Sequence, residues 1–277
     1  MPMRLTLVRH LWGVTEAWAE FLPRAKAAGY DAIEVNILEL APERRRELTA
    51  RLTDLGLGLV AQIFTNGFVA GGAVATHVDS FQRQCDLALG MGARLINCHG
   101  GRDAFTRDEA LDFYRRVVDH ERGLSLAVAH ELHRGRVFHA PWTTVPVLAA
   151  FPTLMVTADF SHWVCVCERL PDDQLPAIRL VAERCLHLHA RVGHAQGPQV
   201  NDPRAPEWAT ELAAHERWWD LCWAAQERRG LAESTLTPEF GPPTYQPTAP
   251  YSGAPLADLS AICDWMARRQ AERFARR

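Results

Sequence analysis

The chain has 277 residues, of which 48% are hydrophobic, and its formal net charge at pH 7 is −3. This charge argues against nucleic acid as a partner, because binding to phosphate backbones needs clustered lysine and arginine. No apolar run approaches the roughly 20 residues that a membrane-spanning helix needs, so we expect no membrane partner. A chain of 277 residues is compatible with one α/β barrel, and we expect a single domain over residues 1–277.

The seven cysteines are an odd number without the spacing of a disulfide framework. Free thiols are typical of a reducing compartment, so we expect a cytoplasmic protein in which Cys165 and Cys167 are ordinary buried thiols. The start of the chain, Met1 to Thr6, places Arg4 within a short strand-like run. It lacks the apolar core of a secretory signal, and we expect none.

Short apolar runs that predict strands alternate with amphipathic segments that predict helices. The first strand covers Arg4 to Arg9, and the helix after it has apolar residues at i, i+3, i+4 and i+7 before it ends at Gly29. The next elements are a strand at Ala32 to Ile37, a helix at Pro42 to Leu55, a strand at Gly58 to Phe64, a helix at Val78 to Met91, a strand at Ala93 to His99 and a helix at Asp108 to Asp119. The second half continues with a strand at Ser125 to His133, a helix at Val145 to Phe151, a strand at Leu154 to His162, a helix at Pro176 to Arg184, a strand at Cys185 to Val192, a helix at Pro206 to Arg229, a strand at Ser234 to Phe240 and a helix at Leu256 to Phe274.

Eight strand–helix pairs are the number at which a parallel sheet closes, so we predict a (β/α)8 TIM barrel of the α/β class. The alternative, an open doubly wound sheet, normally has a G-x-G-x-x-G turn after its first strand, and residues 9–15 lack it. Long loops follow three of the strands, at Thr65 to His77, Arg134 to Thr144 and Gly193 to Ala205. Long loops at one face of a barrel predict a lid over a site.

Five predicted strands end in acidic or imidazole side chains, and in a barrel these ends converge on one mouth. Such groups are costly in apolar strands unless they are paired or bind a metal, so we predict a shared site. We expect one divalent ion, with Mn²⁺ as first choice and Mg²⁺, Co²⁺ or Zn²⁺ as alternatives, and these ligands: Glu131, Asp159, His189 and Glu239. His187 points the same way as His189 but lies deeper, where we expect a hydrogen-bonded residue.

These strand ends resemble those of the xylose isomerase-like TIM barrels, a family that includes sugar-phosphate isomerases, ketose 3-epimerases and the AP endonuclease family 2 enzyme endonuclease IV. The resemblance covers nearly the whole chain and also rests on the segments Ala28 to Glu34 and Leu89 to Ala93. It implies that one metal ion is held from strands five to eight at the four positions given above. It also implies that His162 binds substrate oxygens and that Arg191 orients the substrate or the second glutamate.

Endonuclease IV holds three zinc ions with additional histidines, and His99 and His162 stand where two of them could lie. The predicted third strand, however, ends in residues 62–66 without a histidine. In the loop after strand seven, Arg204 stands where the nuclease pattern has a histidine two residues beyond Asp202. These departures argue against a trinuclear site, so a phosphodiesterase is the third hypothesis.

The predicted ligands suit removal of a proton from a carbon next to a carbonyl, with a divalent ion stabilising the enediolate. Glu131 and Glu239 fit as the acid/base pair. If both act, on opposite faces of the substrate, the carbon is inverted, as in an epimerase; if one acts alone, the proton moves between carbons, as in an isomerase. A dehydratase or lyase on a polyol or cyclic acid begins with the same step and is the second hypothesis. The complete ligand set argues against a non-catalytic binding protein.

Basic residues just beyond Glu131 add a substrate hypothesis. Arg134 and Arg136, together with Arg191, would clamp a carboxylate or phosphate by bidentate hydrogen bonds, which favours an acidic sugar derivative. The expected small-molecule partner is a sugar or a sugar acid. The alternative is that the two loop arginines are solvated charges. His99, at the end of the fourth strand, is a further candidate for substrate binding.

Aromatic residues near the predicted mouth are Trp142, Trp163 and Phe68, and for each we favour packing over stacking on a sugar ring. His10 and Glu34, at the ends of strands one and two, are left open between substrate contact and support of the ligands. A helix rich in tryptophan offers an interface for a homo-oligomer through Trp208, Trp218, Trp219 and Trp223.

Overall fold

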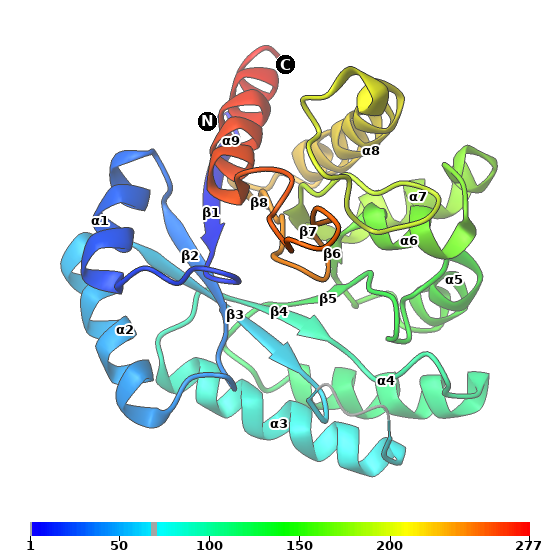
Figure 1. Cartoon of the computed structure of the whole chain (residues 1–277). Helices are drawn as coiled ribbons and strands as arrows, with labels where there is room; N and C mark the ends of the chain where they lie inside the picture. The colour runs from blue at the N-terminus through cyan, green and yellow to red at the C-terminus, as the bar shows by residue number, and fades with distance from the viewer. Residues whose placement is uncertain (1, 68–70) are drawn as a thin grey trace.

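Eight parallel strands form a closed barrel in the computed structural model, which describes residues 2–67 and 71–277 (Figure 1). The strands pair in chain order, and β1 closes the ring by pairing with β8, Leu5 opposite Ser234. The strands are β1 (Arg4–His10), β2 (Ala32–Asn36), β3 (Gly58–Phe64), β4 (Leu95–His99), β5 (Val128–Glu131), β6 (Val156–Ala158), β7 (Cys185–His189) and β8 (Glu233–Thr237). The predicted TIM barrel is therefore confirmed.

Helices surround the barrel on its outer face (Figure 1). They are α1 (Trp18–Ala27), α2 (Pro42–Leu55), α3 (Val74–Gly90), α4 (Arg107–Glu121), α5 (Pro141–Ala150), α6 (Phe160–Cys167), α7 (Leu175–Arg184), α8 (Ala209–Arg228) and α9 (Leu259–Ala275). Their ends follow local chemistry: Thr106 and Glu109 form a capping box that begins α4, and α2 ends at Gly56 with a left-handed φ of 60°.

The sixth strand is shorter than predicted. We expected a strand from Leu154 to His162, but β6 ends at Ala158 and the chain turns at once into α6. Asp159 is the N-cap of this helix, because its Oδ1 accepts a hydrogen bond from the backbone N–H of Ser161 at 3.1 Å. The apolar run after it is a mostly buried helix, in which Cys165, expected to be a buried thiol, and Val166 are half-buried. Periodicity alone does not separate a short buried helix from a strand.

Two apolar layers surround the strands. Val8, Ala32, Val60, Leu95 and Ala129 form a small cluster of their own, while a much larger cluster lies between the sheet and the helices. Toward the carboxyl ends of the strands the inward-facing residues become polar. This change places polar groups at one mouth of the barrel, where sites in this fold are built.

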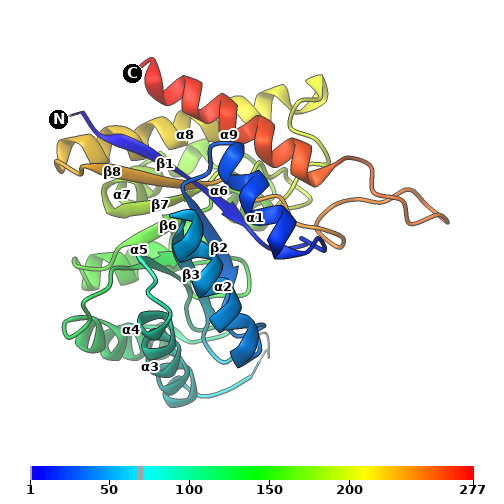
Figure 2. The same ribbon diagram turned by 90° about the vertical axis from the view of Figure 1, so that its left-hand side faces the viewer.

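The loop between β8 and α9 projects beyond the barrel, as Figure 2 shows in orange. It carries an antiparallel bridge between Thr248 and Pro255, with the fully exposed Tyr251 between them. None of the helices in the described part of the chain is long and apolar enough to cross a membrane.

Candidate metal centre

Four side chains from consecutive strand ends meet at the barrel mouth. Glu131 is the last residue of β5, Asp159 directly follows β6, His189 is the last residue of β7, and Glu239 lies two residues beyond β8. All four are buried, and each offers one ligand atom within 4.8 Å of the others. The structure thus brings the four predicted ligands together. Three carboxylates and one imidazole suit a hard or borderline divalent ion.

Unpaired polar atoms support this fit. Glu131 Oε1 is buried without a hydrogen-bond partner, and His189 Nδ1 and Glu239 Oε2 are buried, make no hydrogen bond and meet only in ion-pair contacts. His189 Nδ1 lies 3.1 Å from Glu239 Oε2, and it lies 3.7 and 3.8 Å from the nearest oxygens of Glu131 and Asp159. Leaving a buried polar atom unsatisfied costs about 1–3 kcal/mol. Because an ion among these atoms would satisfy all of them, the residues present fit a divalent metal.

Arg191 lies beside the carboxylates. Its Nη2 donates to Asp159 Oδ2 at 2.5 Å and is 3.2 Å from Glu239 Oε2, while its Nε donates to Ser161 Oγ at 3.1 Å. Burial would lower the pKa of this guanidinium, but Asp159 and Glu239 raise it above its usual value. Arg191 is therefore a fixed positive charge that offsets part of the negative charge of the cluster.

The pKa values in the cluster move apart. Burial raises the pKa of Glu131 to about 7, against the opposing charge of His189. Burial would also raise the pKa of Glu239, but His189 and Arg191 hold it below its usual range. Burial would lower the pKa of His189, yet the surrounding carboxylates, Glu239 first, raise it well above its usual value. In the metal-free protein His189 is therefore an imidazolium at neutral pH.

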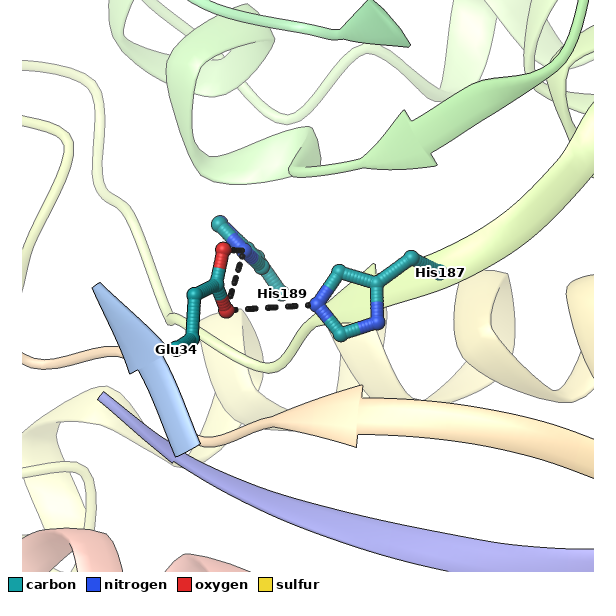
Figure 3. A group of neighbouring side chains, drawn as sticks. All are labelled: Glu34, His187 and His189. Carbon is teal, nitrogen blue, oxygen red and sulfur yellow. Dashed lines mark hydrogen bonds and ion pairs between the residues drawn. The ribbon is translucent and has the colours of Figure 1, made fainter. Parts of the chain in front are cut away.

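A second buried group, made of Glu34 and His187, lies against the His189 ring (Figure 3). Glu34 faces the Nε2 atom of His189, at 3.1 and 3.2 Å from its two oxygens, and the Nε2 atom of His187, at 3.3 Å. Burial would raise the pKa of Glu34, but the charge and hydrogen bonds of the two histidines hold it well below its usual range. Sequence reasoning had left the role of Glu34 open, and the structure places it against the ring of a predicted ligand.

A cavity of about 620 Å³ opens over this cluster and is lined by Glu131, Arg191 and Glu239. The predicted substrate-binding residue His99 also lines it, stacked on Phe64 with ring centroids 3.8 Å apart. Further lining residues come from the loops and strand ends around the mouth: His10, Trp12, Trp18, Glu34, Glu39, Arg44, Gln62, His133 and Tyr245. The cavity thus joins a polar floor to a partly aromatic wall.

The other predicted substrate-binding residues apart from Arg191 do not line the cavity, and they differ in what they contact. His162 is fully buried, with its Nε2 atom 2.6 Å from Arg191 Nη2, and is not among the residues that line the cavity. Arg134 is half-buried, with its guanidinium carbon 4.8 Å from the centre of the Tyr245 ring. Arg136 turns away from the cavity and donates to the carbonyl oxygens of Thr65, Gly101 and Gly67, at 3.1, 3.2 and 2.8 Å. This arrangement indicates that Arg136 braces loops and does not contact substrate.

Most of the aromatic residues singled out in the sequence pack within the chain. Trp163 is fully buried and donates to the carbonyl oxygen of Phe138, whereas Trp142 is 55% exposed outside the cavity. Phe68 lies outside the described residues. The predicted oligomer interface is wrong for three of its four tryptophans, because Trp218, Trp219 and Trp223 are at most 1% exposed within one chain; Trp208, just before α8, is half-buried.

Two aromatic residues of the mouth were missed by sequence reasoning. Trp12 and Tyr245 come from the loops after β1 and β8 and meet edge to face, with centroids 4.8 Å apart. Neither lies in a periodic element, so no pattern marked them. Asn97, within β4, was missed as well: its amide nitrogen donates to Glu131 Oε2 at 2.6 Å and to Glu34 Oε1 at 3.0 Å.

The fold and this cluster define a (β/α)8 barrel whose mouth can hold a divalent ion. A family model described as xylose isomerase-like TIM barrel matches residues 22–206, and the chain belongs to that family. No protein with a curated description matches the sequence significantly.

Solved structures of similar fold carry several descriptions. D-allulose 3-epimerase from Methylomonas sp. is 14% identical, with a TM-score of 0.62 over 98% of each chain. The probable 3-DHS dehydratase AsbF from Bacillus anthracis is 13% identical, with a TM-score of 0.60 over 96% of this chain and 98% of that one. The IOLI protein, described with a bound zinc atom, is 10% identical, with a TM-score of 0.63 over 98% of this chain and 96% of that one. At these identities the likeness shows the fold.

Proposed function

We propose that this protein is a divalent-metal-dependent isomerase or epimerase that acts on a sugar by removing a proton next to a carbonyl group. One ion, with Mn²⁺ as first choice, is held by the cluster of four ligands at the mouth. The observation that carries the proposal is that Glu131 and Glu239 both line the cavity, and each has a buried oxygen without a hydrogen-bond partner. Two such carboxylates beside one cation can act as the general base that removes a proton from carbon and the general acid that returns one.

The bound ion would act as a Lewis acid that stabilises negative charge on the substrate oxygens as the proton leaves. The protein's own groups do the rest. Glu131 and Glu239 come from β5 and β8, three strands apart around the ring, so they approach a bound substrate from different directions. One takes the proton from carbon and the other returns a proton, and this use of both carboxylates favours epimerisation.

Arg191 orients the second glutamate in this scheme. Its Nη2 atom lies 3.2 Å from Glu239 Oε2 and donates to Asp159 Oδ2, while its Nε donates to Ser161 Oγ. The guanidinium thus holds the Glu239 carboxylate in place and keeps it ionised and ready to accept a proton. His99 also lines the cavity; its Nε2 atom lies 2.9 Å from Glu131 Oε2, so it is placed beside a predicted ligand, and its Nδ1 atom has no hydrogen-bond partner.

The cavity favours a neutral sugar over a sugar acid. Five carboxylates line it, from Glu16, Glu34, Glu39, Glu131 and Glu239, against two arginines. Arg191 is committed to two carboxylates, and Arg44 pairs with Glu47 outside the cavity lining. A clamp for a substrate anion would rest on Arg134 alone, since Arg136 is occupied by backbone carbonyls.

A dehydratase acting on a polyol or cyclic acid is the second candidate, because it needs the same proton abstraction and a probable dehydratase shares the fold at a TM-score of 0.60. A nuclease finds less support. Arg204, at the place of a nuclease histidine, forms an exposed ion pair with Asp202 at 2.6 Å and does not line the cavity.

Exchange of substrate hydrogen with solvent tests the proposal. The protein would be loaded with Mn²⁺ and incubated in deuterated water with neutral ketoses, aldoses, sugar acids and cyclic acids, and the products examined by NMR. We expect deuterium at the carbon next to the carbonyl of a neutral sugar, and a loss of at least ~10³-fold in rate in Glu239→Gln and Glu131→Gln. Glu216→Gln is the matched control, because Glu216 is a buried glutamate on α8 that is hydrogen-bonded to Arg269 and Gln270 of α9 and does not line the cavity. Elimination of water would establish the dehydratase, and cleavage of abasic DNA without exchange would refute the proposal.

A further inference from the structure

We propose that Glu34 is a positioning residue that fixes the tautomer and orientation of His189 and so decides which of its nitrogens meets the metal. This inference rests on the proposed function, since it concerns the same metal centre. Glu34 lies against the Nε2 atom of the His189 ring, whereas the ligand carboxylates lie nearest its Nδ1 atom. It acts from the opposite edge of the imidazole ring (Figure 3).

The two nitrogens of His189 face different partners. Nε2 lies 3.1 and 3.2 Å from the two oxygens of Glu34, whereas Nδ1 points to the ligand carboxylates and has no hydrogen-bond partner. A neutral imidazole has one N–H and one lone pair. With Nε2–H donated to Glu34, the lone pair is left on Nδ1, where the ion would sit. A carboxylate behind a ligating histidine in this way fixes the ring and increases its basicity.

Glu34 is itself held rigidly. The hydroxyl of Thr237 donates to its Oε2 at 2.5 Å, and the amide of Asn97 donates to its Oε1 at 3.0 Å. The same amide nitrogen donates to Glu131 Oε2 at 2.6 Å, so its two hydrogens serve two carboxylates. Through Asn97 the position of Glu34 is coupled to a second predicted ligand, and through its own oxygens to His189.

A second metal site made of Glu34, His187 and His189 is the competing interpretation, since their ligand atoms also lie within 4.8 Å of one another. Three observations argue against it. Both nitrogens of His187 have threonine hydroxyls within 3.1 Å, from Thr235 and Thr237. Both oxygens of Glu34 already accept hydrogen bonds. None of the side-chain atoms of Glu34 or His187 is among the buried atoms without a partner, in contrast to the four-ligand cluster.

The variant Glu34→Gln tests the proposal, with Co²⁺ and Zn²⁺ as the ions. We expect one ion per chain in both proteins, but affinity lower in the variant by about 10–100-fold. In the zinc-loaded, ¹⁵N-histidine-labelled protein, the Nε2–H proton of His189 should lie far downfield and shift upfield in the variant, because its acceptor is no longer an anion. Glu216→Gln, which makes the same change at a buried glutamate of α8, should leave affinity and this signal unchanged.

Thr237→Val guards against a folding failure of the first variant, because it keeps the shape and removes only the hydroxyl that donates to Glu34. It should weaken Co²⁺ binding in the same direction by a smaller factor. Unchanged affinity and unchanged His189 signal in Glu34→Gln would overturn the positioning role. Two ions per wild-type chain and one in Glu34→Gln would make Glu34 a ligand of a second metal and overturn it as well. A wild-type protein that binds no ion would overturn the proposed function together with this inference. That result differs from the two outcomes above, in which the wild type binds metal and only the role of Glu34 fails.

Discussion

The guanidinium of Arg191 and the carboxylate of Asp159 form a buried ion pair, with 2.5 Å between Nη2 and Oδ2. Both side chains are at most 1% exposed, and Glu239 lies within 3.2 Å of the same nitrogen. Without a metal, Arg191 and the imidazolium of His189 are the cations that face the carboxylates of the cluster. The stability of the metal-free protein should therefore depend on Arg191 more than that of the metal-loaded protein.

We predict that Arg191→Met destabilises the metal-free protein by about 3–5 kcal/mol, because removal of one partner leaves a buried charge uncompensated. Added Mn²⁺ should restore part of this loss and raise the melting temperature more in the variant than in the wild type. Thermal unfolding with chelator and with Mn²⁺ measures both effects. Arg228→Met, which breaks an exposed pair with Glu183, is the control and should change little. An equal metal-induced shift in Arg191→Met and wild type would contradict the prediction.

The strand ends could be predicted because carboxylates and imidazoles inside apolar runs are conspicuous, and the barrel topology brings such ends together. The sequence predicted Asp159 as a ligand even though the predicted sixth strand was too long. Its position in the chain was enough to place it near the carboxyl end of β6. No sequence pattern predicts the direction in which a long side chain in a loop points. Arg134 and Arg136 are two residues apart in one basic stretch, yet one reaches Tyr245 and the other the carbonyl oxygens of Thr65, Gly67 and Gly101.

Metal binding should release protons. With the pKa of Glu131 at about 7 and that of His189 well above its usual value, both groups hold protons at pH 6 in the metal-free protein. Both must lose them to become ligands, so affinity rises with pH. We expect the logarithm of the association constant for Mn²⁺ to rise by about two per pH unit below pH 7 and by about one per pH unit above it. Calorimetric titration with Mn²⁺ in buffers of different ionisation enthalpy counts the protons, and affinity independent of pH between pH 6 and 8 would count against this assignment.

The contrast between Arg134 and Arg136 is testable by matched substitutions. Arg136→Leu should lower the free energy of unfolding by about 3–5 kcal/mol, because three backbone carbonyls lose a charged donor and such hydrogen bonds are worth about 1.5–3 kcal/mol each, without full additivity. Arg134→Leu should leave the unfolding free energy nearly unchanged and alter only substrate binding. Urea unfolding compares the two, and similar losses of stability would refute the distinction.

His215 gives the fold a dependence on acid. Burial lowers its pKa from 6.5 to about 4, and its two nitrogens already pair with the N–H of Gly193 and the carbonyl oxygen of Glu211. Because the pKa of His215 is lower in the folded than in the unfolded protein, the neutral, buried ring contributes to stability above pH 6.5, and this contribution is lost as pH falls toward 4. The loss would reach about 3 kcal/mol at pH 4. His215→Gln retains an acceptor without a titrating group, so its unfolding free energy should fall less over this range; an equal fall in urea titrations would exclude His215 as the cause.

Gly241 leaves room for the ring of Trp12, which forms the aromatic wall of the cavity together with Tyr245. A Cβ at this position would overlap the ring of Trp12, and the backbone is held against the loop by Gln199, which accepts from the Gly241 N–H at 2.7 Å. Gly241→Ala should therefore push Trp12 from its place against Tyr245, raise KM for the substrate by about 10-fold or more, and leave Mn²⁺ affinity unchanged. Gly90→Ala is the control, because a Cβ there meets nothing within 4 Å. If KM does not change in Gly241→Ala, Trp12 does not contact the substrate; if Mn²⁺ affinity falls, the wall and the metal centre are one unit.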